Sequence, residues 1–205
     1  MSKRRTVIFV AGPTGSGKST LVRALTQRAA VYIEDATLNP HFAVRSRATF
    51  DARASQSWFL DQMAEFLGRH RTGVLAIDQH PRVVSRVYGA MFCAKGLLSE
   101  SALTRLDRYA DRLLKELTES GANVLTVCLT ASTETLRGRL LRRKRRGLTS
   151  SEVLSVNRLY SSVVFPGPCL SMNTDVMSSQ RERAVLEAWL SEPSAIRLVK
   201  RMPAL

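Results

Sequence analysis

One stretch of this sequence decides its fold: Gly12-Pro13-Thr14-Gly15-Ser16-Gly17-Lys18-Ser19-Thr20. It fills every fixed position of the pattern G-x-x-x-x-G-K-[ST]. An apolar run over residues 7–11 precedes it, and apolar residues with helical spacing follow over residues 21–25. A buried strand that turns into a helix through a glycine-rich loop is the setting in which this pattern binds phosphate. The sequence therefore predicts a site for a nucleoside triphosphate at residues 12–20.

The loop residues have distinct predicted roles. The glycines let backbone N–H groups turn onto phosphate oxygens, and the N-terminus of the following helix adds partial positive charge. We expect Lys18 to reach the β and γ phosphates and the Ser19 hydroxyl to ligate Mg²⁺. ATP and Mg²⁺ are therefore the expected cofactors.

Length and composition indicate one globular domain over residues 1–205. The apolar fraction is 44%, there is no run of eighteen apolar residues, and the N-terminus leads directly into a core strand. The three cysteines, Cys93, Cys128 and Cys169, lie far apart in apolar contexts, which indicates buried reduced thiols. We therefore expect no membrane association and an intracellular location, cytoplasmic or nuclear.

The chain is strongly basic. It has 31 Lys and Arg against 17 Asp and Glu, a net charge of +14, and seven of the basic residues lie within residues 137–146. Such a cluster is typical of nonspecific nucleic-acid affinity or of a nuclear localisation signal. Nucleic acid is therefore an alternative partner to a small molecule.

Strand-like and helix-like segments alternate along the chain. The predicted strands are residues 7–11, 31–34, 74–77, 123–130 and 169–173, and the predicted helices are residues 21–28, 52–68, 81–92, 99–119, 133–141, 150–163 and 178–190. This alternation predicts an α/β fold of the P-loop kinase type, with a five-stranded parallel sheet flanked by helices. Residues 191–205 are expected to form a tail.

Two acidic residues stand at the ends of predicted strands, Glu34 after the second and Asp78 after the third. In open parallel sheets, ligands bind beyond the carboxyl ends of the strands, so both should lie near the loop. Phosphoryl transfer requires positive charge, a metal ion and a carboxylate that orients or deprotonates the acceptor. We expect Asp78 to bind Mg²⁺ directly or through water, together with Ser19, and Glu34 to be the general base.

An arginine-rich segment at about residues 139–148 is the predicted lid. Arg139, Arg143 and Arg145 are spaced so that they could fold over the phosphates and exclude water. A solvated basic end of a helix is the alternative interpretation.

The set of motifs resembles the deoxyribonucleoside kinase family, most closely its herpesviral thymidine kinase branch, over about residues 6–165. Three segments carry the resemblance: Val31-Tyr32-Ile33-Glu34, similar to the segment with the catalytic glutamate; Asp78-Gln79-His80-Pro81, similar to the Asp-Arg-His-Pro motif; and Arg139-Leu140-x-x-Arg143-x-Arg145-x-Gly147, similar to the arginine lid.

The resemblance implies a substrate pocket. Gln56 matches the glutamine that reads the edge of the base, and Tyr88 matches the aromatic residue that stacks on it. Phe59 would face the base from the other side, and Gln79 would lie beside the acceptor hydroxyl. The family's helices at 52–68 and 81–93 imply a homodimer.

Some positions depart from the family pattern. Gln79 replaces an arginine, and Asn39 stands where a tryptophan would wall the sugar pocket. No acid follows the lid, because Leu148-Thr149-Ser150 stands there. Arg82 or Arg86 on the following helix, or an arginine of the lid, is expected to supply the missing positive charge.

These observations predict ATP-dependent phosphorylation of a deoxyribonucleoside, thymidine kinase-like, to its 5′-monophosphate. One alternative is a nucleoside monophosphate kinase, in which Arg45 and Arg47 would bind the acceptor phosphate. Another is a non-catalytic member of the family that binds nucleotide, nucleic acid or a protein partner.

Overall fold

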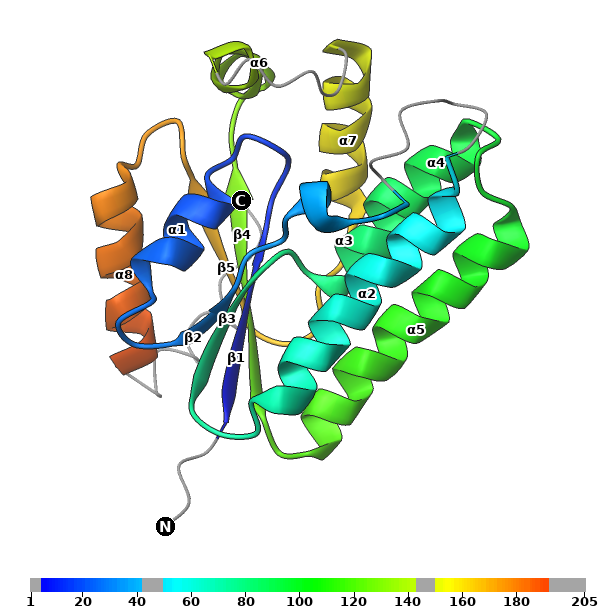
Figure 1. Ribbon diagram of the computed structural model, residues 1–205. Helices are drawn as coiled ribbons and strands as arrows, with labels where there is room; N and C mark the ends of the chain where they lie inside the picture. The colour runs from blue at the N-terminus through cyan, green and yellow to red at the C-terminus, as the bar shows by residue number, and fades with distance from the viewer. Residues whose placement is uncertain (1–4, 42–49, 143–149, 192–205) are drawn as a thin grey trace.

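The computed structural model describes residues 5–41, 50–142 and 150–191 (Figure 1). Several predicted positions lie outside the described residues: Arg45 and Arg47, the lid residues Arg143 and Arg145, and the tail from residue 192 onward.

A five-stranded parallel sheet forms the centre of the molecule (Figure 1). Its order is β2-β3-β1-β4-β5, and the strands are β1 (Thr6–Ala11), β2 (Ala30–Tyr32), β3 (Val74–Asp78), β4 (Asn123–Thr130) and β5 (Cys169–Asn173). All four pairings between neighbouring strands are parallel. The carboxyl ends of the strands therefore meet at one edge, and the predicted fold class is confirmed.

Helices cover both faces of the sheet. They are α1 (Lys18–Ala24), α2 (Ala52–Arg69), α3 (Pro81–Val83), the π-helix η2 (Val84–Gly89), α4 (Ala90–Ala94), α5 (Glu100–Glu119), α6 (Thr133–Arg142), α7 (Ser150–Ser162) and α8 (Ser179–Ser191), with a short 3₁₀ turn, η1 (Ala36–Leu38). Among the described residues, none of the helices combines the length and the apolar character that crossing a bilayer requires.

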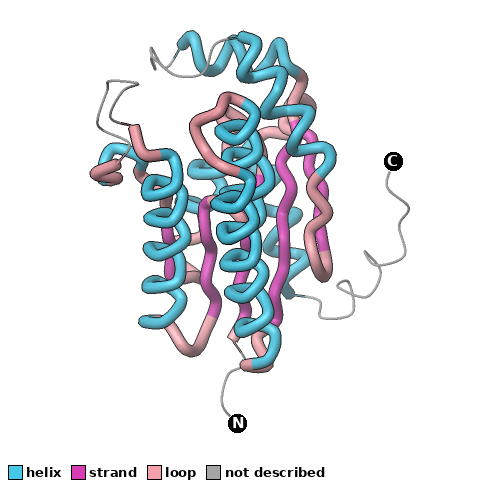
Figure 2. The backbone as a smooth tube through the Cα atoms, turned by 90° about the vertical axis from the view of Figure 1, so that its right-hand side faces the viewer, coloured by secondary structure: helices cyan, strands magenta, loops and turns pink. Residues whose placement is uncertain are grey.

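Alternation along β1 explains the layered arrangement. Ile8 and Val10 pack toward α1 and α8, in one cluster with Trp189. Val7 and Phe9 point to the other face, where they pack against side chains of α2 and α5. Figure 2 shows the helices of this second layer in front of the strands. Since both faces of β1 are fully buried, its run of apolar residues is what a central parallel strand requires.

The segment from Pro81 to Ala94 forms one continuous helical stretch in the interior. His80 caps its start, where its ring nitrogen Nδ1 accepts a hydrogen bond from the backbone N–H of Arg82. The stretch packs against α2, α5 and α7 and buries Val83, Val87 and Met91. These contacts fix the segment between the helices around it, and its contribution to a homodimer stays a prediction.

The end of β2 differs from the prediction. The strand stops at Tyr32, so Glu34 lies in the loop before η1 instead of on the strand. Asp35 begins the 3₁₀ turn, where its side chain accepts hydrogen bonds from the backbone N–H and the hydroxyl of Thr37. This turn draws the chain away from the sheet and directs Glu34 toward the carboxyl end of β3.

Candidate functional site

The loop of residues 12–20, named the P-loop here, connects β1 to α1. Gly12 has a φ of +153°, and a Cβ atom there would lie 2.6 Å from the carbonyl oxygen of Leu129 and from the Ser16 hydroxyl oxygen. Only glycine fits this position. Gly17, with a φ of +104°, precedes α1 as its N-cap. The backbone therefore has the tight turn that the sequence pattern predicts.

Two side chains of the P-loop, Lys18 and Ser16, have different surroundings. Lys18 folds back over the loop, where its Nζ donates to the carbonyl oxygen of Pro13 at 3.4 Å, and its charge also acts on Glu34. The Ser16 hydroxyl is fully buried and has no hydrogen-bond partner among the described residues.

Ser19 and Asp78 are in direct contact. The Ser19 hydroxyl donates a hydrogen bond to Oδ2 of Asp78, which is 3% exposed at the end of β3. Asp78 is in register with Val10, so it lies directly beside the start of the P-loop. The residues present fit Mg²⁺, because this cation takes one or two protein oxygens, completes its shell with water and phosphate oxygens, and needs no larger protein cage. Among the described residues, no group of three or more His, Cys, Asp or Glu side chains is gathered around a common point.

Glu34 is a carboxyl group whose pKa lies far above its ordinary value. Burial and, to a smaller extent, the nearby negative charge of Asp78 raise its pKa to about 8, although the positive charge of Lys18 acts in the opposite direction. Its side chain keeps partial contact with solvent. A carboxyl with a pKa near neutrality can accept and release a proton under physiological conditions.

A pair of buried tyrosine hydroxyls closes the other side of the site. The Tyr88 hydroxyl is hydrogen-bonded to the Thr14 hydroxyl at 3.1 Å, and the Tyr160 hydroxyl donates to Oε1 of Gln79 at 2.9 Å. The backbone of Gly12 also hydrogen-bonds the Tyr160 hydroxyl. Burial raises the pKa of Tyr88 to about 12 and also raises the pKa of Tyr160 well above its ordinary value, so both are neutral hydroxyls.

Tyr160 is the residue that the sequence did not identify as part of the site. It lies on α7, some 80 positions after Gln79, so only the fold brings the two together. In the sequence, only its location on the helix directly after the predicted lid indicated that Tyr160 could lie near the site.

Gln79 has an unusual backbone. Its φ is +108°, the left-handed region that favours glycine, and it is 2% exposed. Its backbone N–H donates to the carbonyl oxygen of Val10 at 3.0 Å, and its side chain accepts from Tyr160. Such a conformation persists where surrounding contacts hold it, and it is often found at functional sites.

Arg82 and Arg86 are each paired with an acidic residue of α5, which does not support them as replacements for the missing arginine of the motif, and the alternative of a lid arginine stays a prediction. Arg82 donates through Nε to Asp111 at 2.7 Å, and Arg86 makes a two-pronged contact with Asp107 at 2.7 and 3.0 Å. Both carboxylates belong to α5, on the face that packs against α3 and η2. These arginines therefore join α3 and η2 to α5 through ion pairs.

The predicted base-binding residues have different surroundings. Gln56 is 3% exposed on α2, and its side chain makes no hydrogen bond to a described residue. Phe59 packs in the cluster of α2, η2 and α5 that contains Leu60 and Val84, whereas Tyr88 packs in the cluster beneath α7. The two rings therefore belong to separate parts of the core.

Asn39 has a structural position. Its amide nitrogen donates to the carbonyl oxygen and the hydroxyl of Ser55 at 3.1 and 3.2 Å, and its amide oxygen accepts from the backbone N–H of His41. It thus attaches the segment after η1 to the first turns of α2.

Arg139 connects the P-loop to the end of β5. It donates to the carbonyl oxygen of Gly15 at 3.2 Å, to the hydroxyl of Thr174 at 2.9 Å and to the carbonyl oxygen of Thr174 at 2.8 Å. The helix α6 continues to Arg142, so the first residues of the predicted lid are helical. In this structure Arg139 braces the loop from behind.

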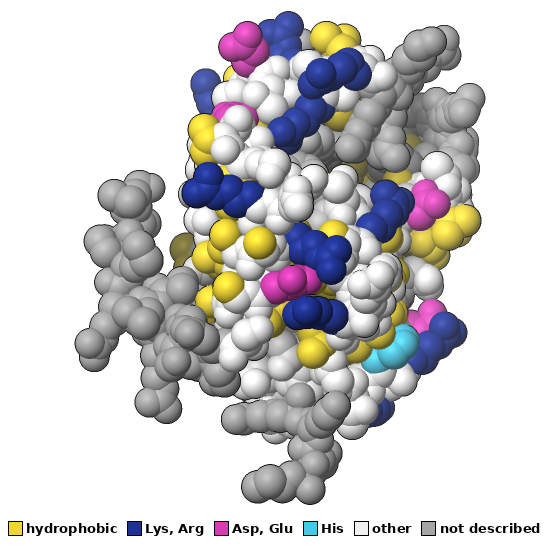
Figure 3. Space-filling model, turned by 90° about the vertical axis from the view of Figure 1, so that its left-hand side faces the viewer, with side chains coloured by type: hydrophobic (Ala, Val, Ile, Leu, Met, Phe, Trp, Pro, Cys, Tyr) yellow, Lys and Arg dark blue, Asp and Glu magenta, His cyan; other side chains and the backbone are white. Residues whose placement is uncertain are grey.

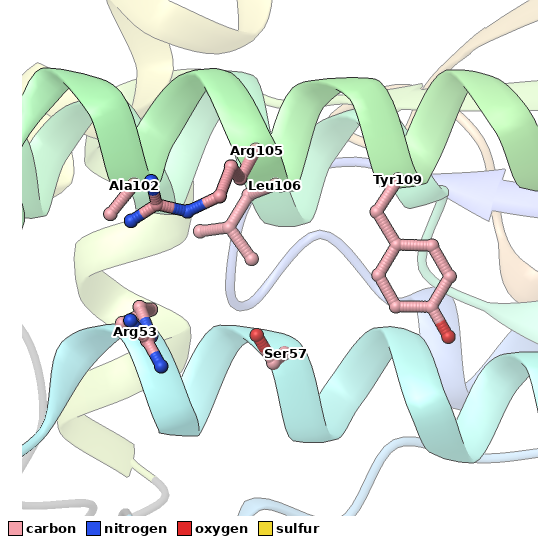
Figure 4. Close-up of a pocket in the computed structure, with 6 residues that line it drawn as sticks. All are labelled: Arg53, Ser57, Ala102, Arg105, Leu106 and Tyr109. Carbon is pink, nitrogen blue, oxygen red and sulfur yellow. The ribbon is translucent and has the colours of Figure 1, made fainter.

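A shallow groove lies apart from these residues, between α2 and α5 (Figure 4). Its lining residues are Arg53, Ser57, Ala102, Arg105, Leu106 and Tyr109, none of which the sequence predicted as a site residue. The site is therefore defined by the residues at the carboxyl ends of the strands and not by this groove.

Solved structures of deoxyadenosine kinase from M. mycoides share the fold. The structure with bound dATP has a TM-score of 0.72 and 14% identity, and covers 92% of this chain and 100% of that chain. The structure with bound dCTP has a TM-score of 0.69 and 16% identity, with coverage of 91% and 100%. At this identity the likeness shows a P-loop kinase fold of the deoxynucleoside kinase kind, and it does not support the thymidine kinase branch.

Comparison with curated proteins found no match. A family model described as an AAA domain matches residues 8–155, which is more than half of the chain. The chain therefore belongs to this family, AAA_18.

Proposed function

We propose that this protein is an ATP-dependent nucleoside kinase that transfers the γ-phosphoryl group to the 5′-hydroxyl of a deoxyribonucleoside. One observation carries the proposal: Glu34, a carboxyl with a pKa of about 8, lies near Asp78 and Lys18 at the mouth of the P-loop. A base, a metal-binding acid and a phosphate-binding lysine in one place are the parts that this reaction requires.

Each of these residues has its own role in the transfer of the phosphoryl group. The P-loop backbone and Lys18 bind and orient the phosphates, and Ser19 with Asp78 would hold Mg²⁺. The cation, when bound, supplies charge neutralisation on the phosphate oxygens. Glu34 accepts the proton of the acceptor hydroxyl as that oxygen attacks phosphorus. Arg139 keeps the carbonyl of Gly15 in place and so helps to maintain the shape of the loop.

The charge on the acceptor side supports a neutral acceptor. Beside the acids Glu34 and Asp78, the described residues there are the neutral groups of Tyr88, Tyr160 and Gln79. A monophosphate acceptor would bring about two further negative charges into this place. A nucleoside is therefore favoured over a nucleoside monophosphate. The alternative subsite of Arg45 and Arg47 lies outside the described residues and stays a prediction.

Resemblance narrows the acceptor further. Gln56, with one amide donor and one acceptor, fits the edge of a pyrimidine or a purine base. The similarity of the motifs favours thymidine, whereas the two solved structures described above are of deoxyadenosine kinase. We propose the deoxyribonucleosides as the substrate class, and the four common ones are the acceptors to be compared.

The test is an assay of the purified chain with Mg-ATP and a panel of nucleosides and nucleoside monophosphates, with ADP and the phosphorylated product both quantified. Glu34→Gln should lower turnover by about a hundredfold or more, because a positioned base contributes this much, and should leave ATP binding nearly unchanged. Glu65→Gln is the matched control, since Glu65 forms an exposed ion pair with Arg69 on α2.

Equal turnover of Glu34→Gln and the wild type would exclude Glu34 as the base. ATP binding without product from any acceptor would overturn the kinase proposal and favour a non-catalytic nucleotide-binding protein.

A further inference from the structure

Two of the three cysteines meet in the sheet, although they are 41 positions apart in the sequence. The Sγ atoms of Cys128 on β4 and Cys169 on β5 are 2.9 Å apart. Their separation along the chain gave no indication of this contact. Cys93, on α4, is the remaining cysteine of the chain.

The strand register explains the contact. Cys169 is in register with Thr126, and Cys128 is in register with Ser171, two residues further along each strand. In-register neighbours, and residues two apart on a strand, point to the same face of a sheet. Both thiols therefore lie on one face, the one on which Cys128 packs with Leu159 of α7.

Both thiols have the proximity and the access that oxidation requires. A disulfide has an S–S distance of about 2.05 Å, so the two sulfur atoms need to approach by less than about 1 Å. Both cysteines are half-buried, and each keeps some contact with solvent. The sheet holds them side by side before any reaction occurs.

The two thiols differ in acidity. The hydrogen bond from Cys128 lowers the pKa of Cys169, whereas the same hydrogen bond and burial raise the pKa of Cys128. A thiolate is the nucleophilic form of cysteine. Cys169 is therefore suited to attack an oxidant, and Cys128 to act second.

We propose that Cys128 and Cys169 form a redox-active dithiol that a peroxide oxidises to an intramolecular disulfide. The Cys169 thiolate attacks one oxygen of hydrogen peroxide and breaks the O–O bond, which gives a sulfenic acid and, after protonation, water. The Cys128 sulfur then attacks the sulfenic sulfur, loses its proton and displaces a second water. In total, two thiols and one peroxide give one disulfide and two water molecules.

The disulfide would tie β5 to β4 across the segment that contains α6 and α7. Cys128 is also in register with Ala11, the residue directly before the P-loop. Oxidation should therefore stabilise the half of the sheet beside the phosphate site. This inference concerns thiol chemistry, so it stands or fails independently of the proposed kinase activity.

The experiment uses the full chain, treated with hydrogen peroxide and then with an alkylating reagent. We expect a mass loss of two hydrogen atoms per chain and a proteolytic fragment that links Cys128 to Cys169, while Cys93 is alkylated and serves as the internal control. A dithiol reductant should restore alkylation of both. The unfolding temperature of the oxidised chain should be higher by several degrees, because the cross-link restricts the unfolded chain.

Single variants separate the two roles. Cys128→Ser should leave Cys169 as a sulfenic acid that dimedone traps, Cys169→Ser should leave Cys128 unoxidised at the same dose, and Cys93→Ser should form the disulfide as the wild type does. The proposal is overturned when the treated wild-type chain has both thiols free, or carries over-oxidised cysteines without a cross-link, or links through Cys93.

Discussion

Glu34 is half-buried beside the like charge of Asp78, and its ionised form therefore lowers the stability of the folded chain. Its pKa is about 8 in the folded protein against 4.5 as the ordinary value. Between these two pH values the folded chain holds a proton that the unfolded chain has released. The free energy of unfolding therefore falls as the pH rises through this window, by at most about 1.4 kcal/mol per pH unit from this group.

Glu34→Gln should remove this dependence. We expect the variant to become progressively more stable than the wild type from pH 5 to pH 8, as measured by urea unfolding at several pH values. Glu65→Gln provides the background, since Glu65 is an exposed residue in an ion pair. Parallel pH profiles for the Glu34 variant and the wild type would show that the carboxyl titrates normally.

Tyr160 and Gln79 form the neutral wall of the acceptor side. Tyr160→Phe removes the hydrogen bond to Oε1 of Gln79 and leaves a strained residue less well held. If the proposed function is correct, KM for the acceptor should rise several-fold while KM for ATP stays close to that of the wild type. Stability should fall by about 1 kcal/mol, the usual value of a hydrogen bond.

Tyr109→Phe is the matched control for this substitution. Its hydroxyl donates to Asp61 at 2.7 Å on the outside of α2 and α5, far from the P-loop in the fold. It should lose a similar amount of stability without changing either KM. Equal kinetic effects of the two variants would mean that Tyr160 has only a structural role.

At the scale of elements, α6 is attached to the P-loop through Arg139 and through packing. A Cβ atom on Gly15 would meet the carbonyl oxygen of Leu136 at 3.5 Å, so the helix lies close against the loop. Arg139→Ala removes the hydrogen bonds that join Gly15 to Thr174. We expect ATP affinity to fall about tenfold, because the loop loses part of its preorganisation, about 1.4 kcal/mol.

Arg137→Ala tests whether charge alone is responsible. Arg137 is exposed on the same helix. Its replacement by Ala therefore removes one positive charge, as Arg139→Ala does, but leaves the hydrogen bonds of Arg139 to Gly15 and Thr174 intact. Calorimetric titration of both variants with Mg-ATP should show a loss for Arg139→Ala and little change for Arg137→Ala. Similar losses in the two variants would indicate a long-range electrostatic effect and no bracing.

Apart from α1 and β2, the elements were predictable to within about two residues; the helix predicted over residues 21–28 is α1, Lys18–Ala24. The strands at 123–130 and 169–173 agree with the structure, because apolar runs bounded by polar turns mark buried strands clearly. The exception at β2 is physical: a three-residue strand at the sheet edge is too short for its pattern to define an end. The predicted strand 31–34 therefore included Glu34.

Contacts between elements were less predictable than the elements. The P-loop, Glu34 and Asp78 could be placed together because parallel strands share one carboxyl edge. The ion pairs of Arg82 and Arg86 depend on which face of α5 turns inward. The contact of Cys128 with Cys169 depends on the register of β4 and β5. Neither follows from spacing along the chain.

For the whole molecule, charge is the property with the clearest consequence. The net charge of +14 predicts attraction to polyanions. On the side of α1 and α8, Figure 3 shows Lys and Arg side chains interspersed with acidic and apolar ones and not gathered in one stripe. A net positive charge without a single basic stripe on this face favours binding that is weak, electrostatic and independent of sequence.

We therefore expect duplex DNA to bind at low ionic strength and to be released as salt is added, with a loss in affinity of about a hundredfold or more between 50 and 200 mM salt. Fluorescence anisotropy with two unrelated DNA sequences measures this, and the two should give equal affinities at each salt concentration. Arg137→Glu with Arg142→Glu, both exposed on α6, should make the salt dependence less steep. A clear preference for one DNA sequence, or binding that resists salt, would instead indicate a dedicated nucleic-acid site.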